Sequence, residues 1–223
     1  MWLSGITICD GMAADFAECK EHIVPAHPFS DDIISVSRKL AERFCCDTEH
    51  IHQVEIAALK LFDALRKANH LTKKDRLLLQ IAAILHNCGS FLNLNDIGEN
   101  SYKIVTSTEI IGLSHQERMI VAYVIRYTTG DFPEYSEIKN EFSREEYIKI
   151  AKLNAILCLA DAMDRSHQQK FTNFTVRKRG YDLTITGQTL YDITLEHGMF
   201  IQKSPFFEEA FGIRPVLRQK KCL

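Results

Sequence analysis

Apolar residues recur at intervals of three and four through most of the chain between Ser30 and His167. This spacing is typical of α-helices that bury one face. The clearest stripe runs through Ile51, Val54, Ala58, Leu61 and Leu65. We therefore expect a mainly α fold, with at least five helices between residues 30 and 168.

Local signals indicate where these helices begin and end. Two capping boxes, in which a serine is followed three residues later by a glutamate, predict helices over about 115–128 and 144–167. Two more helices are expected to be capped at their starts by Ser30 and Thr48. Another is expected to run from Lys73 to His86.

The pattern changes after Gln169. Short β-type runs appear at 174–176, 181–186 and 213–218, with a helical stretch near 192–203 before the last of them. The sequence therefore predicts a helical domain followed by a small ββαβ C-terminal α/β domain. The expected division of the chain is 1–27, 28–169 and 170–223.

Composition restricts the class of protein. Apolar residues make up 46% and charged residues 25%, a balance that excludes disorder as the main state. No run approaches the roughly 18 apolar residues of a membrane span. The seven cysteines are odd in number and contain no CxxC pair, which argues against a disulfide framework or a zinc knuckle. With no evident targeting segment, these features predict a cytoplasmic protein.

Charge is distributed unevenly along the chain. Residues 165–223 carry ten Lys and Arg against five Asp and Glu, whereas the remainder carries seventeen against twenty-four. A basic end on an acidic body can attract a polyanion. An ordinary solvated surface is the alternative interpretation.

Three ionisable residues fall on inward faces of the predicted helices. His50 precedes Val54 by one helical turn, His86 closes a strongly apolar helix, and Asp161 continues the stripe of another. A buried carboxylate is costly unless it is paired or binds a metal. Hydrogen-bonded core histidines and an Asp–Arg ion pair are the simpler alternative. Taken together, the three resemble the His, His-Asp, Asp arrangement of HD-type metal sites.

Six sequence blocks follow one another in the order EHIHQVEIAALKLFDAL, LLLQIAAILHNCGSFLN, SYKIV, GLSHQERMIVAYVIRY, LADAMDRSHQQK and FEEAFGI. Blocks of this kind, in this order, resemble the C-terminal half of the exopolyphosphatase/guanosine pentaphosphatase (Ppx/GppA) family. The resemblance covers nearly the whole chain and implies an HD-like helical domain. The opening SGITICDGM resembles the end of that family's actin-like phosphatase half. We therefore expect residues 1–27 to be a strand and helix remnant of that half.

The chain departs from the family's pattern at three places. No histidine occurs in Ile97-Gly98-Glu99-Asn100, where many members have a His-rich stretch, and Thr128-Thr129 stands where relatives often continue with His. The third departure is in the HD pair. The pair reads His86-Asn87, and asparagine is a neutral, weak metal ligand where the family's pattern has an aspartate. We therefore expect a degenerate metal site formed by His50, His86, Asn87 and Asp161. No cofactor is firmly expected there, and a divalent metal is expected to bind weakly rather than tightly.

The resemblance also implies a function. The family's phosphate-binding loops and catalytic carboxylate lie in its N-terminal half, so we expect an accessory module without catalytic activity of its own. It is expected to bind polyphosphate or guanosine tetra- or pentaphosphate, and to form a homodimer or associate with a catalytic phosphatase half. No nucleic acid or membrane partner is expected. The candidate polyanion-binding residues are Arg126, Arg165, Lys170, Arg177, Lys178, Arg179, Lys220 and Lys221. The alternatives are a single-metal HD-type phosphohydrolase of a nucleotide or phosphate ester, and a pure interaction domain.

Overall fold

The computed structural model describes residues 11, 29–66, 69–171 and 173–220. It confirms the mainly α body and the small α/β unit that follows it. The helical body comprises α2 (Phe29–Arg43), α3 (Thr48–Leu65), α4 (Lys73–Leu85), the 3-10 helix η2 (Cys88–Phe91), α5 (Ile97–Ser107), α6 (His115–Arg126), α7 (Tyr135–Ile138) and α8 (Arg144–Ala162). The strand and helix remnant expected over 1–27 lies outside the described residues, apart from Gly11. The expected domain limits stay a prediction.

The C-terminal unit has the predicted ββαβ order. It comprises β1 (Asn173–Arg179), β2 (Asp182–Gln188), α9 (Thr194–Phe211) and β3 (Arg214–Lys220). Strand β2 lies in the middle of the sheet, antiparallel to β1 and parallel to β3. Ile185 pairs with Val176 on one side and Leu217 on the other, so apolar residues face the helices together.

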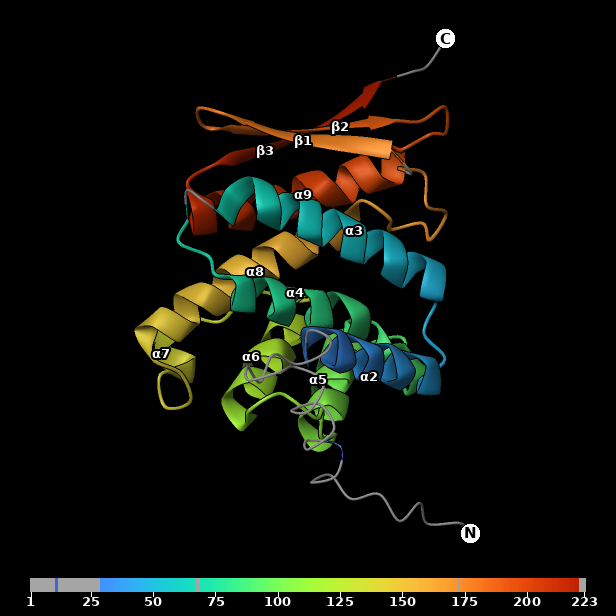
Figure 1. The fold of residues 1–223 in the computed structure, drawn as a ribbon. Coiled ribbons are helices and arrows are strands. Elements are labelled where there is room, and N and C mark those ends of the chain that lie inside the picture. Colours follow the sequence, from blue (N-terminus) through green and yellow to red (C-terminus); the bar gives the residue numbers. More distant parts are fainter. Residues whose placement is uncertain (1–10, 12–28, 67–68, 172, 221–223) are drawn as a thin grey trace.

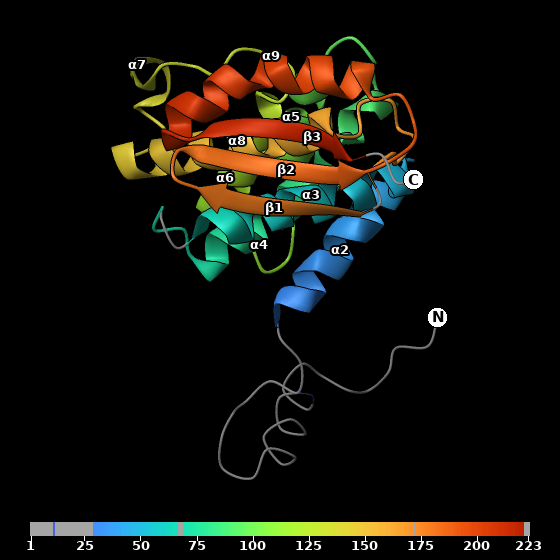
Figure 2. The ribbon, with the colours of Figure 1, turned by 90° about the horizontal axis from the view of Figure 1, so that it is seen from above.

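The sheet closes one end of the molecule (Figure 1). Helices α3 and α9 lie directly beneath it, α8 and α4 follow, and α2, α5 and α6 lie at the far end. Seen from above, the outer face of the three strands is covered by no described element (Figure 2). Inside the described part of the chain, no helix is both long and apolar enough to cross a membrane.

Helix α8 is the centre of the body. Every residue from Leu153 to Ala160 is buried, because α8 packs against α3, α4, α6 and α9 on its different sides. A helix that is apolar all round is stable only inside a protein. This placement carries Asp161, the next residue along α8, into the interior of the molecule.

The caps agree with the sequence at two helices and differ at two. Ser30, the expected cap of α2, lies inside that helix, because the helical residues include Phe29 before it. Both predicted capping boxes are present, at the starts of α6 and α8. The expected cap of α3, Thr48, is instead its first helical residue. Asp47 is the cap, and its carboxylate accepts hydrogen bonds from the backbone N–H groups of Glu49 and His50. Asp47 therefore fixes the turn that carries His50.

Two helix ends also differ from expectation. Helix α8 stops at Ala162, five residues before the predicted end at 167, and the chain turns there. Helix α9 continues to Phe211 instead of stopping near 203, although Pro205 lies inside it. It ends at Gly212, whose φ of 63° is the left-handed conformation that glycine adopts without strain.

Candidate metal centre and basic sheet face

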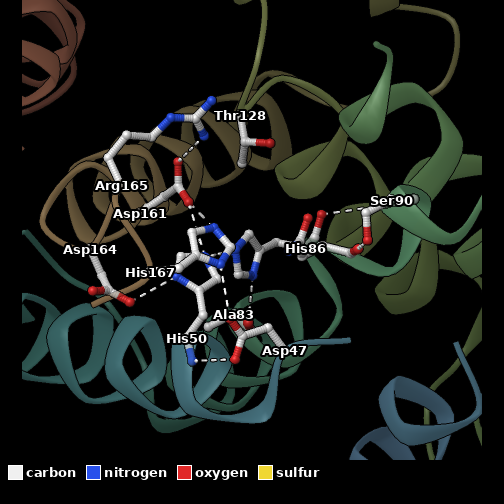
Figure 3. A network of polar contacts seen from close by, with 12 residues as sticks. Asp47, His50, Ala83, His86, Ser90, Thr128, Asp161, Asp164, Arg165 and His167 are labelled. Atoms are coloured by element: carbon white, nitrogen blue, oxygen red, sulfur yellow. Dashed lines mark hydrogen bonds and ion pairs between the residues drawn. The ribbon is translucent and has the colours of Figure 1, made fainter. Parts of the chain in front are cut away.

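Three ionisable side chains converge between α3, α4 and α8 (Figure 3). His50 comes from the first turn of α3, His86 is the C-cap of α4, and Asp161 lies at the end of α8. The Nε2 atoms of His50 and His86 are 3.2 Å apart. Asp161 Oδ1 lies 3.4 Å from the first and 3.6 Å from the second. The convergence expected from the helical stripes is therefore present.

The second nitrogen of each imidazole ring is held by a separate acceptor. His50 Nδ1 lies 2.9 Å from Oδ2 of Asp164, and His86 Nδ1 lies 2.7 Å from the carbonyl oxygen of Ala83. A carbonyl or ionised carboxylate oxygen accepts and does not donate, so both Nδ1 atoms carry the proton. The Nε2 atoms of both rings then point toward each other and toward Asp161.

This crowding shifts the protonation equilibria of the group. Burial alone would lower the pKa of His50, but hydrogen bonds and charges from Asp161 and Asp164 raise it to about 9. Burial likewise opposes ionisation of Asp161, yet the two histidines hold the pKa of that carboxyl well below its usual range. In the absence of another cation, a proton on His50 thus balances the carboxylates.

The group opens onto a cavity of about 240 Å³. The ring of His167 stacks on that of His50, with 3.7 Å between centroids and 6° between planes, and covers one side. Arg165 Nη1 lies 3.7 Å from Asp161 Oδ2 on another side. Asn87 lines the cavity, but the three convergent ligand atoms come from His50, His86 and Asp161.

The geometry fits a single metal ion. A tetrahedral ion with bonds of about 2.0–2.1 Å separates its ligand atoms by about 3.3–3.4 Å. The three observed separations between ligand atoms, 3.2, 3.4 and 3.6 Å, lie within about 0.2 Å of that range. Asp164, which orients His50, was missed by sequence reasoning. It lies beyond the end of α8, where helical spacing gives no signal.

A second group of polar residues lies on the outer face of the sheet. Side chains alternate between the two faces of a strand, so the partners of outward residues also point outward. Three rows across the strands carry cations: Asn173–Gln188–Lys220, Thr175–Thr186–Arg218 and Arg177–Thr184–Val216. The fourth row is Arg179–Asp182–Arg214, in which Arg214 pairs with Asp182 at 3.0 Å. Five cations therefore share this face with one acid.

The predicted polyanion residues divide between this face and other places. Arg177, Arg179 and Lys220 lie on it, whereas Lys178 points to the opposite side of β1 because it alternates with them. Arg214 and Arg218 are not among the predicted residues, because the sequence pattern does not fix the register of β3. Lys221 lies outside the described residues.

Three further predicted cations have partners elsewhere. Lys170 Nζ lies 3.1 Å from Oε2 of the fully buried Glu196. Arg126 Nε lies 2.7 Å from Oε2 of Glu99, and its guanidinium stacks on Tyr102. Arg165 borders the candidate metal centre. The structure thus does not bring these three to the sheet face.

The fold and the interior group define a mainly helical domain with a His/His/Asp centre and a small C-terminal sheet. A family model described as Ppx/GppA phosphatase, domain III, matches residues 34–203. The match extends over most of the chain, which therefore belongs to the Ppx/GppA phosphatase family. No curated protein sequence matches the chain significantly.

Proposed function

We propose that the chain is an accessory, non-catalytic module of the Ppx/GppA family that binds linear polyphosphate on the outer face of its sheet. The observation that carries this proposal is the accumulation of five cations and one acid on one uncovered face. Charge of one sign on a single surface raises the local concentration of an anionic ligand.

The layout of the face supports a chain-like ligand. The cations lie on the two outer strands, and the middle strand presents the neutral side chains of Thr184, Thr186 and Gln188. Strands are about 4.8 Å apart, so the two cationic rows are about 10 Å apart. Hydroxyl and amide groups between them can donate hydrogen bonds to phosphate oxygens. A hollow of about 440 Å³ lies at one end, between Arg177 and Lys220.

The same face favours phosphate over a nucleobase. None of its twelve outward residues is aromatic, whereas bases are usually held by stacking on aromatic rings. Linear polyphosphate is therefore a better candidate than guanosine tetra- or pentaphosphate, and single-stranded nucleic acid is a poorer one. The single acid, Asp182, is paired with Arg214, so the face carries no free general base. This arrangement suits binding rather than hydrolysis.

A charge-matched pair of variants tests the proposal. The variant Arg177→Ala, Arg179→Ala, Arg218→Ala removes three cations from the face. The control Lys39→Ala, Arg43→Ala, Lys73→Ala removes the same charge from exposed positions of the helical body. In a titration with long-chain polyphosphate, we expect the first variant to lose at least about tenfold in affinity. The control should retain nearly all of it, and equal losses in the two variants would contradict the proposal.

A homodimer, or a complex with a catalytic phosphatase half, forms part of the same proposal. Phe91, Leu92 and Leu94 are each more than half exposed and lie in one short segment, which suits a protein contact. Sedimentation velocity over a range of concentrations, with Leu92→Glu and Leu94→Glu together, tests the homodimer. A cytoplasmic location is also proposed, supported by the four free cysteines of the described residues.

A second candidate function is hydrolysis of a phosphate ester or nucleotide at the interior centre. One observation favours it, namely the convergence of His50, His86 and Asp161 beside Arg165. A bound metal ion would supply a Lewis acid there, and Arg165 offers a guanidinium to a phosphate group. Phosphate release from a nucleoside triphosphate in Mn²⁺, lost in His86→Ala and kept in the sheet variant, would support this function over the first.

A further inference from the structure

The three facing atoms of the interior group have only one another as partners. The Nδ1 protons of His50 and His86 are directed away, to Asp164 and to the carbonyl of Ala83. The two Nε2 lone pairs and a carboxylate oxygen of Asp161 therefore face one another across 3.2–3.6 Å. Electron-rich atoms at these distances repel unless a proton or a metal cation lies between them.

The second observation is that hydrogen bonds to groups outside the ligand set orient both histidine rings. Histidines that bind metals almost always donate their other ring N–H to a carboxylate or a backbone carbonyl, which fixes the tautomer and the ring plane. His50 has the first kind of acceptor and His86 has the second. Asp164 is itself anchored, because its Oδ1 accepts the backbone N–H of Gln169 at 2.7 Å. The ligands are thus held in position by the fold.

We infer that His50, His86 and Asp161 form a mononuclear site for a Zn²⁺-type divalent ion, and that Asp164 is its positioning residue. Two imidazole nitrogens and one carboxylate oxygen suit zinc and its neighbours in the transition series. Magnesium and calcium prefer sites made only of oxygen ligands. Three ligands leave at least one coordination position open to the cavity.

Asp164 changes the expectation that was based on Asn87. That expectation of weak binding assumed that replacing the aspartate of the HD pair leaves the site short of negative charge. The structure supplies a second, almost fully buried carboxylate behind His50, only one imidazole ring away from the ion. A carboxylate in this position makes the imidazole a stronger ligand. The site therefore holds two negative charges close to the metal position without Asn87.

The test measures metal binding directly on the full chain. The protein is stripped with a chelator and titrated with ZnCl₂ in competition with a chromophoric chelator. We expect one ion per chain. Loading with Co²⁺ should give the visible absorption of a four- or five-coordinate ion. Saturation only by Mg²⁺, or no Zn²⁺ uptake by folded protein, would overturn the inference.

Variants separate the ligands from the positioning residue. His86→Ala should remove stoichiometric binding, whereas His52→Ala, an exposed histidine on the same helix, should leave it unchanged. Asp164→Asn should weaken Zn²⁺ binding about 10- to 100-fold and alter the Co²⁺ spectrum. Unchanged affinity in Asp164→Asn would contradict its role. If that variant unfolds, the wild-type melting temperature still decides, because it must rise with added Zn²⁺ and fall with chelator.

Discussion

At the scale of single residues, His50 belongs to the candidate metal centre and its ionisation also contributes to the stability of the protein. It is almost fully buried, it lies between Asp161 and Asp164, and its first turn is capped by Asp47. The paired carboxylates favour the charged imidazole more than burial disfavours it, so its pKa rises to about 9. The lowered pKa of Asp161 reflects the same ion pair, so the pKa shifts of His50 and Asp161 count as one contribution to the free energy of unfolding.

The metal-free protein should lose stability at alkaline pH. The unfolded pKa of histidine is about 6.5, so the contribution of charged His50 is complete below that pH. It is lost as pH rises through about 9. We expect urea unfolding in the presence of chelator to show a decrease on the order of 2–3 kcal/mol between pH 6.5 and 9.5. His50→Gln should flatten this dependence, and the exposed His52→Gln should not.

The residue scale also shows what the sequence could predict about the site. The sequence could predict His50, His86 and Asp161 because each continues an apolar stripe of a helix. Residues on one stripe of a helix point to the same side, so these side chains were expected to point inward. Asp164 and His167 lie in the turn after α8, where the backbone is irregular and His167 adopts a φ of 54°. An irregular segment has no repeating pattern of apolar residues from which the direction of a side chain can be predicted. The structure is therefore needed to show that both residues contact His50.

At the scale of elements, the contact between Phe171 and Gly187 connects the sheet to the body. Phe171 is fully buried, and the main-chain carbonyl of the same residue accepts a hydrogen bond from Gln53 of α3 at 2.6 Å. A Cβ atom at Gly187 of β2 would lie 2.1 Å from Cδ1 of that ring. The glycine therefore provides the space into which the aromatic ring packs.

Gly187→Ala should accordingly destabilise the protein. Forcing extra atoms into a packed contact typically costs about 1–3 kcal/mol, since Phe171 has no free space to enter. Gly198→Ala, within α9, is the matched control, because a Cβ there meets nothing within 4 Å. That control should be neutral or stabilise the protein by up to about 1 kcal/mol. Urea midpoints that move equally in the two variants would contradict this account.

The ion pair of Lys170 and Glu196 connects the loop after α8 to α9. Glu196 is fully buried and also accepts a hydrogen bond from Ser166. Lys170→Met should leave that carboxylate without its cation and cost about 3 kcal/mol, the lower end for a broken buried pair. The exposed Lys178→Met should change stability by less than about 0.5 kcal/mol.

Two further measurements make this prediction specific. Adding Glu196→Gln to Lys170→Met should restore part of the lost stability, because the uncompensated charge is then removed. Polyphosphate affinity should be unchanged in Lys170→Met, since Lys170 does not lie on the outer face of the sheet. A loss of polyphosphate affinity without a loss of stability would instead show that Lys170 contributes to polyphosphate binding.

At the scale of the whole molecule, the C-terminal charge imbalance was visible in the sequence but its arrangement was not. The run Arg177-Lys178-Arg179 alternates across β1, so only two of its three cations face outward together. Arg214 and Arg218 join them because β3 pairs in parallel with β2 in a fixed register. Pairing between segments some 30 residues apart depends on packing against α9, which no local pattern specifies.

The two candidate sites occupy separate parts of the molecule. The metal centre lies inside the helical body, and none of the residues that line its cavity belongs to the outer face of the sheet. One ligand changes the affinity for another only if its binding alters the contacts that the other makes. The metal cavity and the sheet face share no residue through which metal binding could alter the contacts of polyphosphate. Removing metal should therefore leave the affinity for polyphosphate unchanged.

Salt dependence then tests the polyanion proposal for the molecule as a whole. A polyanion releases condensed counterions when cationic side chains replace them, and each contact contributes about 0.7 to the slope of log K against log salt for a flexible strand. Five cations predict a slope of about −3 to −4 for the wild type. The Arg177→Ala, Arg179→Ala, Arg218→Ala variant should reduce it to about −1, whereas the Lys39→Ala, Arg43→Ala, Lys73→Ala control keeps it. An affinity that does not change with salt would remove the electrostatic mechanism, and a slope that falls equally in both variants would place the binding surface elsewhere.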